Sequence, residues 1–317
     1  MPGMVTEVDT EHADEALLRH MYEIRRVCHR AVAPQEEPPD LAWGVSGMRV
    51  TPPGEQRWHG TAGDPVVAYG GLYLPPGVTT GFLRICVLPE HRRRGHGTAL
   101  LDAALSRARA LGRTHITGVY GDPAAAEFTA VTGAERGHSV IACRLDLPAR
   151  LAPAPVPGYR AVSWTGPAPD ELLDSYARAR NAIADAPSDS GGRLHDEWTP
   201  DRVRDEEAAV AARGQQLRVT AIVADSGEVA ALTQLVAAPP PEVVVSTEDT
   251  AVVPAHRRRG LATWVKAESL ARLAADRPDA AVVKTSNAGT NTGMLAVNHA
   301  LGFTVTSTWT SVVYHLR

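Results

Sequence analysis

Two arginine- and glycine-rich turns have the residue types and spacing needed to hold a charged ligand. The pattern V-x-P-x-H-R-R-R-G occurs at Val87–Gly95 and again at Val252–Gly260, at a constant offset of 165 residues. A helix is expected to begin at the end of each turn, and its first N–H groups have no partner within the helix. Together with the positive end of the helix dipole they form an anion site. The pattern therefore predicts two sites suited to a pyrophosphate, with arginine side chains adding charge-assisted contacts.

The elements that position these turns are also repeated. Each turn follows an apolar strand and precedes a helix, a second apolar strand (115–120 and 281–285), a short helix and a final strand. Small residues open the helix after each turn: Gly95 and Gly97, then Gly260 and Ala262. In the first copy an apolar stripe predicts the core face of that helix, with Gly112 as its stop: Leu100, Leu101, Ala104, Leu105, Ala108 and Leu111. The chain is thus expected to contain the same fold twice.

Proline marks the expected boundaries. Residues 146–160 are rich in proline and predict a linker, which divides the chain into domains 1–150 and 151–317. The Gly- and Pro-rich segment 39–65 is expected to be mostly loop. The cluster Ala237–Glu242 is expected to connect two strands.

Composition excludes several classes of protein. The 317 residues suffice for two domains, and 44% are hydrophobic. A net charge of −4 argues against a nucleic acid partner. Three cysteines without CxxC spacing fit a reduced intracellular protein, and no cluster has metal-ligand spacing. The chain shows neither a signal-peptide pattern nor a long apolar run, so we expect a cytoplasmic protein without membrane contact.

The two turns also resemble a known family. V-x-P-x-x-R-x-x-G-x-G/A, matched at Val87–Gly97 and Val252–Ala262, is similar to the pyrophosphate-binding signature of the GNAT N-acetyltransferases. Lys284–Phe303 looks like that family's fifth strand, asparagine-bearing turn and helix ending in L-G-F. The arrangement resembles the tandem acetyltransferases of actinobacteria, such as mycothiol synthase. The resemblance concerns the architecture and does not extend to the substrate.

The resemblance implies an α/β (α+β) fold class: two tandem GNAT acyl-CoA acyltransferase folds, each a mixed, splayed β-sheet flanked by helices. Acetyl-CoA (coenzyme A) would lie between the fourth and fifth strands of a copy, with its pyrophosphate on the turn and its pantetheine arm on the fourth strand. The implied cofactor-binding residues of the first copy are Val87, Leu88, Arg92, Arg93, Arg94, Gly95, His96, Gly97 and Thr98. Those of the second copy are Val252, Val253, Arg257, Arg258, Arg259, Gly260, Leu261, Ala262, Thr263, Asn291 and Asn298.

Two of these positions have alternative interpretations. Asn291 is equally well placed to cap the helix that follows it. Asn298 occupies a position where the family often has a tyrosine that protonates the departing thiolate, and an amide is not a good acid. Tyr314 and His299 are weaker candidates for that role.

In this family a carboxylate on the fourth strand usually serves as the general base that deprotonates the acceptor amine. The expected fourth strand of the first copy (79–87) has no carboxylate, whereas that of the second (243–253) contains Glu248 and Asp249. Strand alternation sends these two side chains to opposite faces, so one can point into a cleft. We favour Glu248 as the base and keep Asp249 as the alternative, and both could instead lie in a bulge or strand end in solvent. The second copy is therefore expected to be the catalytic one.

The acceptor site in such folds is lined by the first helices of the domain. In the second copy we assign Asn181 and Asp185 to the substrate, although an ordinary loop between helices would also explain them. The expected reaction is acetyl transfer to a primary amine of a small molecule by a monomer or homodimer. The alternatives are acyl or aminoacyl transfer from a carrier protein or tRNA, and a non-catalytic CoA-binding module.

Overall fold

A computed structural model describes residues 4–36, 41–149, 154–185, 197–239 and 242–316. These residues form two compact units. The N-terminal unit comprises the described residues up to Ser139 and again from Ser307 onward, and the C-terminal unit comprises those from Val140 to Thr306. None of the helices in the described part of the chain is long and apolar enough to span a membrane.

The N-terminal unit is a mixed sheet with strand order β1-β2-β3-β4-β5-β12. Helix α3 packs on one face, while α1 and α2 pack together on the other. Its elements are β1 (Val5–Glu7), α1 (Glu15–Val32), α2 (Leu41–Arg49), β2 (Gln56–Ala62), β3 (Ala68–Leu74), β4 (Thr80–Val87), a 3₁₀ turn (Pro89–His91), α3 (His96–Ala110), β5 (His115–Tyr120), α4 (Pro123–Val131) and most of β12 (Thr304–His315).

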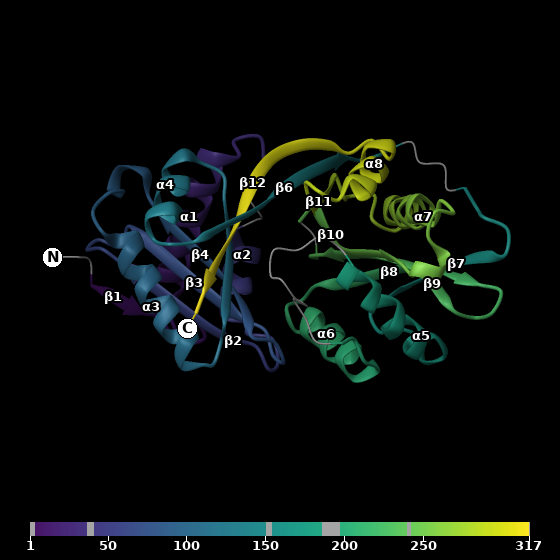
Figure 1. Cartoon of the computed structure of the whole chain (residues 1–317), viewed down its shortest axis with the longest axis horizontal. Coiled ribbons are helices and arrows are strands. Elements are labelled where there is room, and N and C mark those ends of the chain that lie inside the picture. The colour runs from purple at the N-terminus through teal and green to yellow at the C-terminus, as the bar shows by residue number, and fades with distance from the viewer. Residues whose placement is uncertain (1–3, 37–40, 150–153, 186–196, 240–241, 317) are drawn as a thin grey trace. The chain divides into compact units, whose positions relative to one another are not determined.

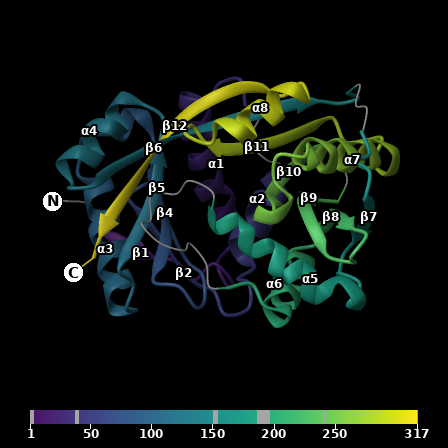
Figure 2. The same ribbon diagram turned by 45° about the vertical axis from the view of Figure 1, so that its right-hand side comes forward.

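The C-terminal unit repeats this plan with strand order β6-β11-β10-β9-β8-β7. Helices α5 and α6 cover one face of its sheet and α7 covers the other (Figure 2). Its elements are part of β6 (Glu135–Asp146), β7 (Tyr159–Thr165), α5 (Asp170–Arg180), a 3₁₀ turn (Asn181–Asp185), α6 (Pro200–Ala212), β8 (Gln216–Ala224), β9 (Val229–Ala237), β10 (Val244–Val252), a 3₁₀ turn (Pro254–His256), α7 (Leu261–Asp276), β11 (Val282–Ala288) and α8 (Thr292–Ala300).

The two copies exchange their last strands, which is a departure from the expected division at residue 150. Strand β6 follows the first copy in sequence but pairs with β11, with Thr285 opposite Cys143. Strand β12 ends the second copy but pairs with β5, with Val313 opposite Thr117. The yellow end of β12 accordingly lies among the blue strands in Figure 1. Both strands have the expected apolar character, but their sequences do not say which edge each one joins.

The expected apolar helix of the first copy is confirmed as α3, with Leu100, Leu101 and Ala104 fully or almost fully buried. Gly112 follows it with a φ of 71°, a backbone conformation that favours glycine. The proline cluster after Ala237 does connect two strands, β9 and β10.

The prediction that residues 39–65 are mostly loop was wrong, because α2 and β2 lie within this segment. Glycine in α2 serves close packing, since a Cβ on Gly44 would lie 1.9 Å from Cζ of Tyr22. Trp58 in β2 fills the space above two further glycines, Gly60 and Gly70.

Candidate active site

The two repeated turns have nearly identical backbone geometry. Arg93 and Arg258 adopt positive φ angles of 62° and 64°, and Gly95 and Gly260 follow with 84° and 80°. Each glycine is the N-cap of the next helix. Non-glycine residues rarely adopt a positive φ, so its occurrence at the same arginine of both turns points to a functional backbone shape.

This shape leaves a row of backbone donors without partners. Within the described residues, the N–H groups of 93–98 and of 258–263 donate to no acceptor. Consecutive N–H groups in this conformation form an anion-binding concavity at a helix start. The side chain of Leu261 is buried in the core, so only its backbone is available. The main-chain N–H groups of the turns are therefore suited to a diphosphate.

The arginine side chains of the two turns differ. The first arginine of each turn bonds to the preceding strand: Arg92 Nε donates to the Val87 carbonyl at 3.3 Å, and Arg257 Nε donates to the Val252 carbonyl at 3.0 Å. In the first copy the next two are also engaged, because Arg93 pairs with Glu127 at 2.9 Å and Arg94 donates to the Glu90 carbonyl at 3.2 Å.

In the second copy, Arg258 and Arg259 are exposed and form no hydrogen bond or ion pair with the described residues. Their guanidinium groups are thus available to a ligand, whereas Arg93 is paired with a carboxylate and Arg94 donates to a backbone carbonyl. We take this as a reason to prefer the second copy as the main anion site.

Each turn lies beside a place where two parallel strands separate. Strand β10 pairs with β11 only from Val244 to Ser246, and β4 pairs with β5 only from Thr80 to Phe82. Beyond these points the edges of β10 and β4 diverge from their parallel neighbours. The expected splayed sheet is therefore present in both units, with Val252 and Val87 on the opened stretches.

Strand β10 contains a β-bulge at Glu248 and Asp249. Its register with β9 shifts between Thr247, opposite Leu235, and Thr250, opposite Thr233, so β10 has one extra residue. The bulge was one of the alternatives left open for these two carboxylates. Bulges redirect side chains, and they are frequent beside active sites.

The two carboxylates have different surroundings. Asp249 accepts a hydrogen bond at 2.9 Å from Arg180, a guanidinium only 1% exposed. Glu248 is exposed and forms no hydrogen bond or ion pair with the described residues. The protein mass around Glu248 nevertheless raises the pKa of its carboxyl, and the negative charges of Asp249 and Glu206 raise it further. A carboxylate with a raised pKa and an open position is suited to accept a proton, whereas Asp249 is committed to an ion pair.

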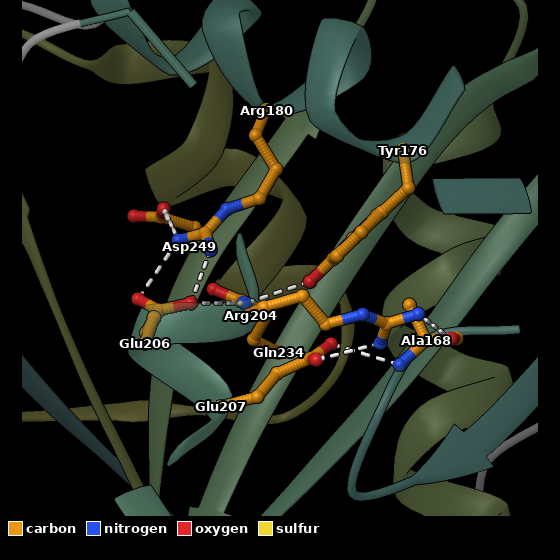
Figure 3. Close-up of polar contacts among 8 residues, drawn as sticks. All are labelled: Ala168, Tyr176, Arg180, Arg204, Glu206, Glu207, Gln234 and Asp249. Carbon is orange, nitrogen blue, oxygen red and sulfur yellow. Dashed lines mark hydrogen bonds and ion pairs between the residues drawn. The ribbon is translucent and has the colours of Figure 1, made fainter. Parts of the chain in front are cut away.

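Arg180 is the centre of a buried polar network (Figure 3). Besides Asp249 it bonds both carboxylate oxygens of Glu206. Gln234 links Glu206 to the hydroxyl of Tyr176, donating to that oxygen at 2.8 Å. Burial alone would lower the pKa of Arg180, but the carboxylates of Glu206 and Asp249 raise it, so the guanidinium stays charged. The network fixes the end of α5 to α6 and β10 and so holds the bulge in place.

Sequence reasoning missed Glu206 and Gln234 in this network. Glu206 lies on a charged helix face that resembles any solvated surface, and Gln234 is a single polar residue in an apolar strand. The buried polar residue in β9 was the one available signal, because such a side chain needs a partner.

The residues assigned to the substrate have other partners. Asn181 bonds through its Oδ1 to the Trp198 N–H at 2.9 Å and through its Nδ2 to the carbonyls of Ala177 and Trp198. Asp185 is exposed and pairs with Arg257 at 2.5 Å. Asn181 therefore joins the end of α5 to the backbone of Trp198, and Asp185 forms an ion pair with the first arginine of the second turn.

The two asparagines of the second copy also have structural contacts. Asn291 caps α8 by accepting a hydrogen bond from the Met294 N–H at 3.2 Å, which is its alternative interpretation. Asn298 is 1% exposed and donates to Oδ1 of Asn287 at 2.7 Å, while its own Oδ1 is buried without a partner in the described residues.

The weaker acid candidates do not complete this site. Tyr314 belongs to the core of the N-terminal unit, where its hydroxyl bonds Thr132 at 2.9 Å. Its hydroxyl is therefore engaged within the N-terminal unit. His299 is exposed on α8. Among the described residues, no three His, Cys, Asp or Glu side chains gather as a metal site would require.

Two splayed sheets with matching anion turns define the class of the fold, and comparisons with known proteins identify it. Residues 18–130 match the model of the acetyltransferase (GNAT) family. The tandem GNAT protein from the clavulanic acid biosynthesis pathway has a similar structure, with a TM-score of 0.79, 25% identity and 99% of each chain covered. A GCN5-related N-acetyltransferase from Sphaerobacter thermophilus shares the fold, with a TM-score of 0.74 and 15% identity over 100% of this chain and 96% of that one. The chain thus has a segment that matches the acetyltransferase (GNAT) family and, over nearly its whole length, a fold similar to that of a tandem GNAT protein.

Two curated relatives are similar over part of their length. The mycothiol acetyltransferase of Clavibacter sepedonicus is 35% identical over 156 residues, which is 47% of each chain. That of Mycolicibacterium paratuberculosis is 34% identical over 146 residues, covering 44% of this chain and 42% of the relative. The match thus spans about half the length of these relatives.

Proposed function

We propose that this protein transfers an acetyl group from acetyl-CoA to a primary amine of a small molecule, and that the C-terminal unit performs the reaction. The observation that carries the proposal is Glu248. It combines an open position, a raised pKa and a place in a bulge five residues before Val253, where β10 enters the second anion turn. The family and the names of the two partly matching relatives support acetyl transfer.

The residues of the C-terminal unit can divide the work as follows. The N–H groups of 258–263 and the side chains of Arg258 and Arg259 would hold the diphosphate of acetyl-CoA, which supplies the acyl group. A backbone N–H on the opened stretch of β10 near Val252 would stabilise negative charge on the carbonyl oxygen. Glu248 would take the proton from the acceptor ammonium, so that the free amine attacks the acyl carbon and the CoA thiolate leaves.

The N-terminal unit has the turn but not the base. Strand β4 pairs with β3 without a register shift, so it lacks the bulge of β10. Leu83 and Arg84 stand in β4 at the distances from Pro89 that Glu248 and Asp249 have from Pro254. We propose that this unit binds CoA without catalysing acetyl transfer.

A matched pair of variants tests this division. Ala262 and Gly97 are each the second residue of the helix after their turn. Aspartate is favourable in the first turn of a helix, so Ala262→Asp and Gly97→Asp should fold while repelling a diphosphate. Calorimetry with CoA and a CoA-release assay with an amine panel are the measurements.

We expect Ala262→Asp to lose one CoA site together with activity, and Gly97→Asp to lose the other site while turnover remains. Turnover by Ala262→Asp at the wild-type rate would refute the assignment to the C-terminal unit. Full binding of CoA without turnover of any amine would instead support the non-catalytic module.

A further inference from the structure

The N-terminal unit places two arginines where the C-terminal unit has an ion pair. Arg25 is the eleventh residue of α1, and Arg180 is the eleventh residue of α5. Arg84 stands five residues before Pro89, as Asp249 stands five residues before Pro254. The repeat therefore keeps the helix arginine and replaces its carboxylate partner on the strand with a second guanidinium.

Arg84 lies on the face of the sheet that is covered by α1, the helix of Arg25. Cys86, two residues after Arg84 and so on the same face of β4, packs in a core cluster with residues of α1. Cys28, one turn after Arg25 on α1, donates a hydrogen bond from its thiol to the Val87 carbonyl at 3.4 Å. The positive charge of Arg25, together with burial, lowers the pKa of Arg84.

The sheet surface beside Arg84 carries polar side chains and a glycine that leaves room for them. Gly71 lies opposite Arg84 in β3, and a Cβ on it would be 2.3 Å from the Tyr69 hydroxyl and 3.1 Å from the Tyr73 hydroxyl. These two hydroxyls are 3.2 Å apart, and His59 Nδ1 lies 3.0 Å from that of Tyr69. Burial lowers the pKa of His59 to about 4, and the charges of Arg57 and Arg25 lower it further, so this imidazole is neutral near pH 7.

Acidic side chains on the neighbouring elements are already committed. Glu23 on α1 pairs with Arg26 and Arg30, and Glu55 before β2 pairs with Arg57. Helix α2 contains no acidic residue. Within the described residues, neither Arg25 nor Arg84 forms an ion pair or hydrogen bond with a carboxylate.

Among the described residues on this face, Cys86 is the ionisable group whose pKa is lowered toward neutrality. The neighbouring thiol of Cys28, followed by the charges of Arg84, Arg25 and Arg92, lowers the pKa of Cys86 to about 7 against the opposing effect of burial. A Cys86 thiolate would balance at most one of the two guanidinium charges. Like charges held close together in a partly buried place cost free energy unless an anion balances them.

We propose that Arg25 and Arg84 form an oxyanion-binding site in the N-terminal unit, for a small molecule that carries a carboxylate or a phosphate. Guanidinium groups bind such oxyanions bidentately, and two of them suit a dianion. The Tyr73 hydroxyl is placed to add a neutral donor. The corresponding place in the C-terminal unit is closed to anions, because Asp249 and Glu206 already neutralise Arg180.

The second copy supplies the design of the test. Arg84→Asp gives Arg25 the carboxylate partner that Arg180 has in Asp249, so this variant should fold. The full chain, saturated with CoA so that the diphosphate turns are filled, is titrated calorimetrically with succinate, with inorganic phosphate and with neutral succinamide. Arg84→Met is a second variant that removes the charge without adding one.

We expect succinate or phosphate to bind wild type and succinamide not to bind. Which of the two binds more tightly identifies the ligand as a carboxylate or a phosphate. Both variants should lose affinity about tenfold or more, the loss expected for a charge-assisted contact, while CoA binding is unchanged. Absence of binding by both anions, or wild-type affinity in Arg84→Asp, would overturn the proposal. This experiment measures anion binding and not acetyl transfer. A failure of the proposed acetyl transfer would therefore not be mistaken for a failure of the anion site.

Discussion

Replacing Glu248 with glutamine keeps the size of the side chain and removes its ability to accept a proton. A general base contributes roughly 10²–10⁴-fold to a rate, so kcat of Glu248→Gln should fall by about that factor near pH 7. The raised pKa of Glu248 also predicts the shape of the pH profile. The acidic limb of wild-type kcat/KM should lie above the usual range of a carboxyl group, and this limb should be absent from the variant.

The same substitution should affect stability in the opposite direction. The pKa of Glu248 is higher in the folded protein than in the unfolded chain, so the fold favours the protonated form. This contribution is present below the unfolded pKa and is lost as the pH rises through the folded pKa, which leaves ionised Glu248 destabilising near neutrality. Glu248→Gln should therefore raise Tm at pH 7 and leave it nearly unchanged at pH 4.

Asp249→Asn is the matched control on the neighbouring residue. Asp249 is 30% exposed at its side chain and pairs with Arg180, which is 1% exposed and keeps Glu206 as a partner. Breaking a buried ion pair costs about 3–5 kcal/mol and breaking an exposed one about 0–1 kcal/mol. We expect Asp249→Asn to lower the free energy of unfolding by an intermediate amount, about 1–3 kcal/mol, and so to lower Tm. Its kcat should fall less than that of Glu248→Gln.

Thermal unfolding and steady-state CoA release on both variants complete the test. The assignment of Glu248 as the base would be refuted by a variant with kcat within a few-fold of wild type and an unchanged acidic limb. A Tm that falls in Glu248→Gln at pH 7 would contradict the electrostatic account of the site.

Two further predictions concern the C-terminal unit. Lys266 is 2% exposed, and burial lowers its pKa to about 8, so its stabilising contribution is full only above the unfolded value near 10.5 and is lost as the pH falls through about 8. Lys266→Met should increase the free energy of unfolding at pH 7 by up to about 3 kcal/mol and so raise Tm, with a smaller gain at pH 10. Equal Tm values for wild type and variant at pH 7 would contradict this prediction. Asp185→Asn removes the partner of Arg257, so we expect a higher KM for acetyl-CoA and an unchanged KM for the amine; the reverse result would return Asp185 to the acceptor site.

The sequence predicted the position of the two turns well because their shape is a property of the local backbone. Positive φ at Arg93 and Arg258, followed by a glycine N-cap, is a local property that the repeated R-R-R-G pattern reveals directly. The helix after the first turn was equally accessible, since its apolar stripe at Leu100, Leu101 and Ala104 reports its buried face.

The parts of the site that depend on residues far apart in the chain could not be predicted from the sequence. Arg180 is buried and bonds to Glu206 and Asp249, which lie 26 and 69 residues away in the chain. Asn181 and Asp185 have the residue types of a substrate pocket, but their contacts with Trp198 and Arg257 could not be read from spacing. A local pattern does not report which side chain reaches which neighbour.

The exchanged final strands have a consequence for how this protein can be made and divided. A fragment ending at residue 150 would retain β6 without its partner β11 and would leave β5 with an unpaired edge, a template for aggregation. During synthesis, the first copy must wait for residues 307–315 before its sheet is complete. Separate expression of the halves should therefore give insoluble material, whereas co-expression of fragments divided between α8 and β12 would leave each strand free to find its partner.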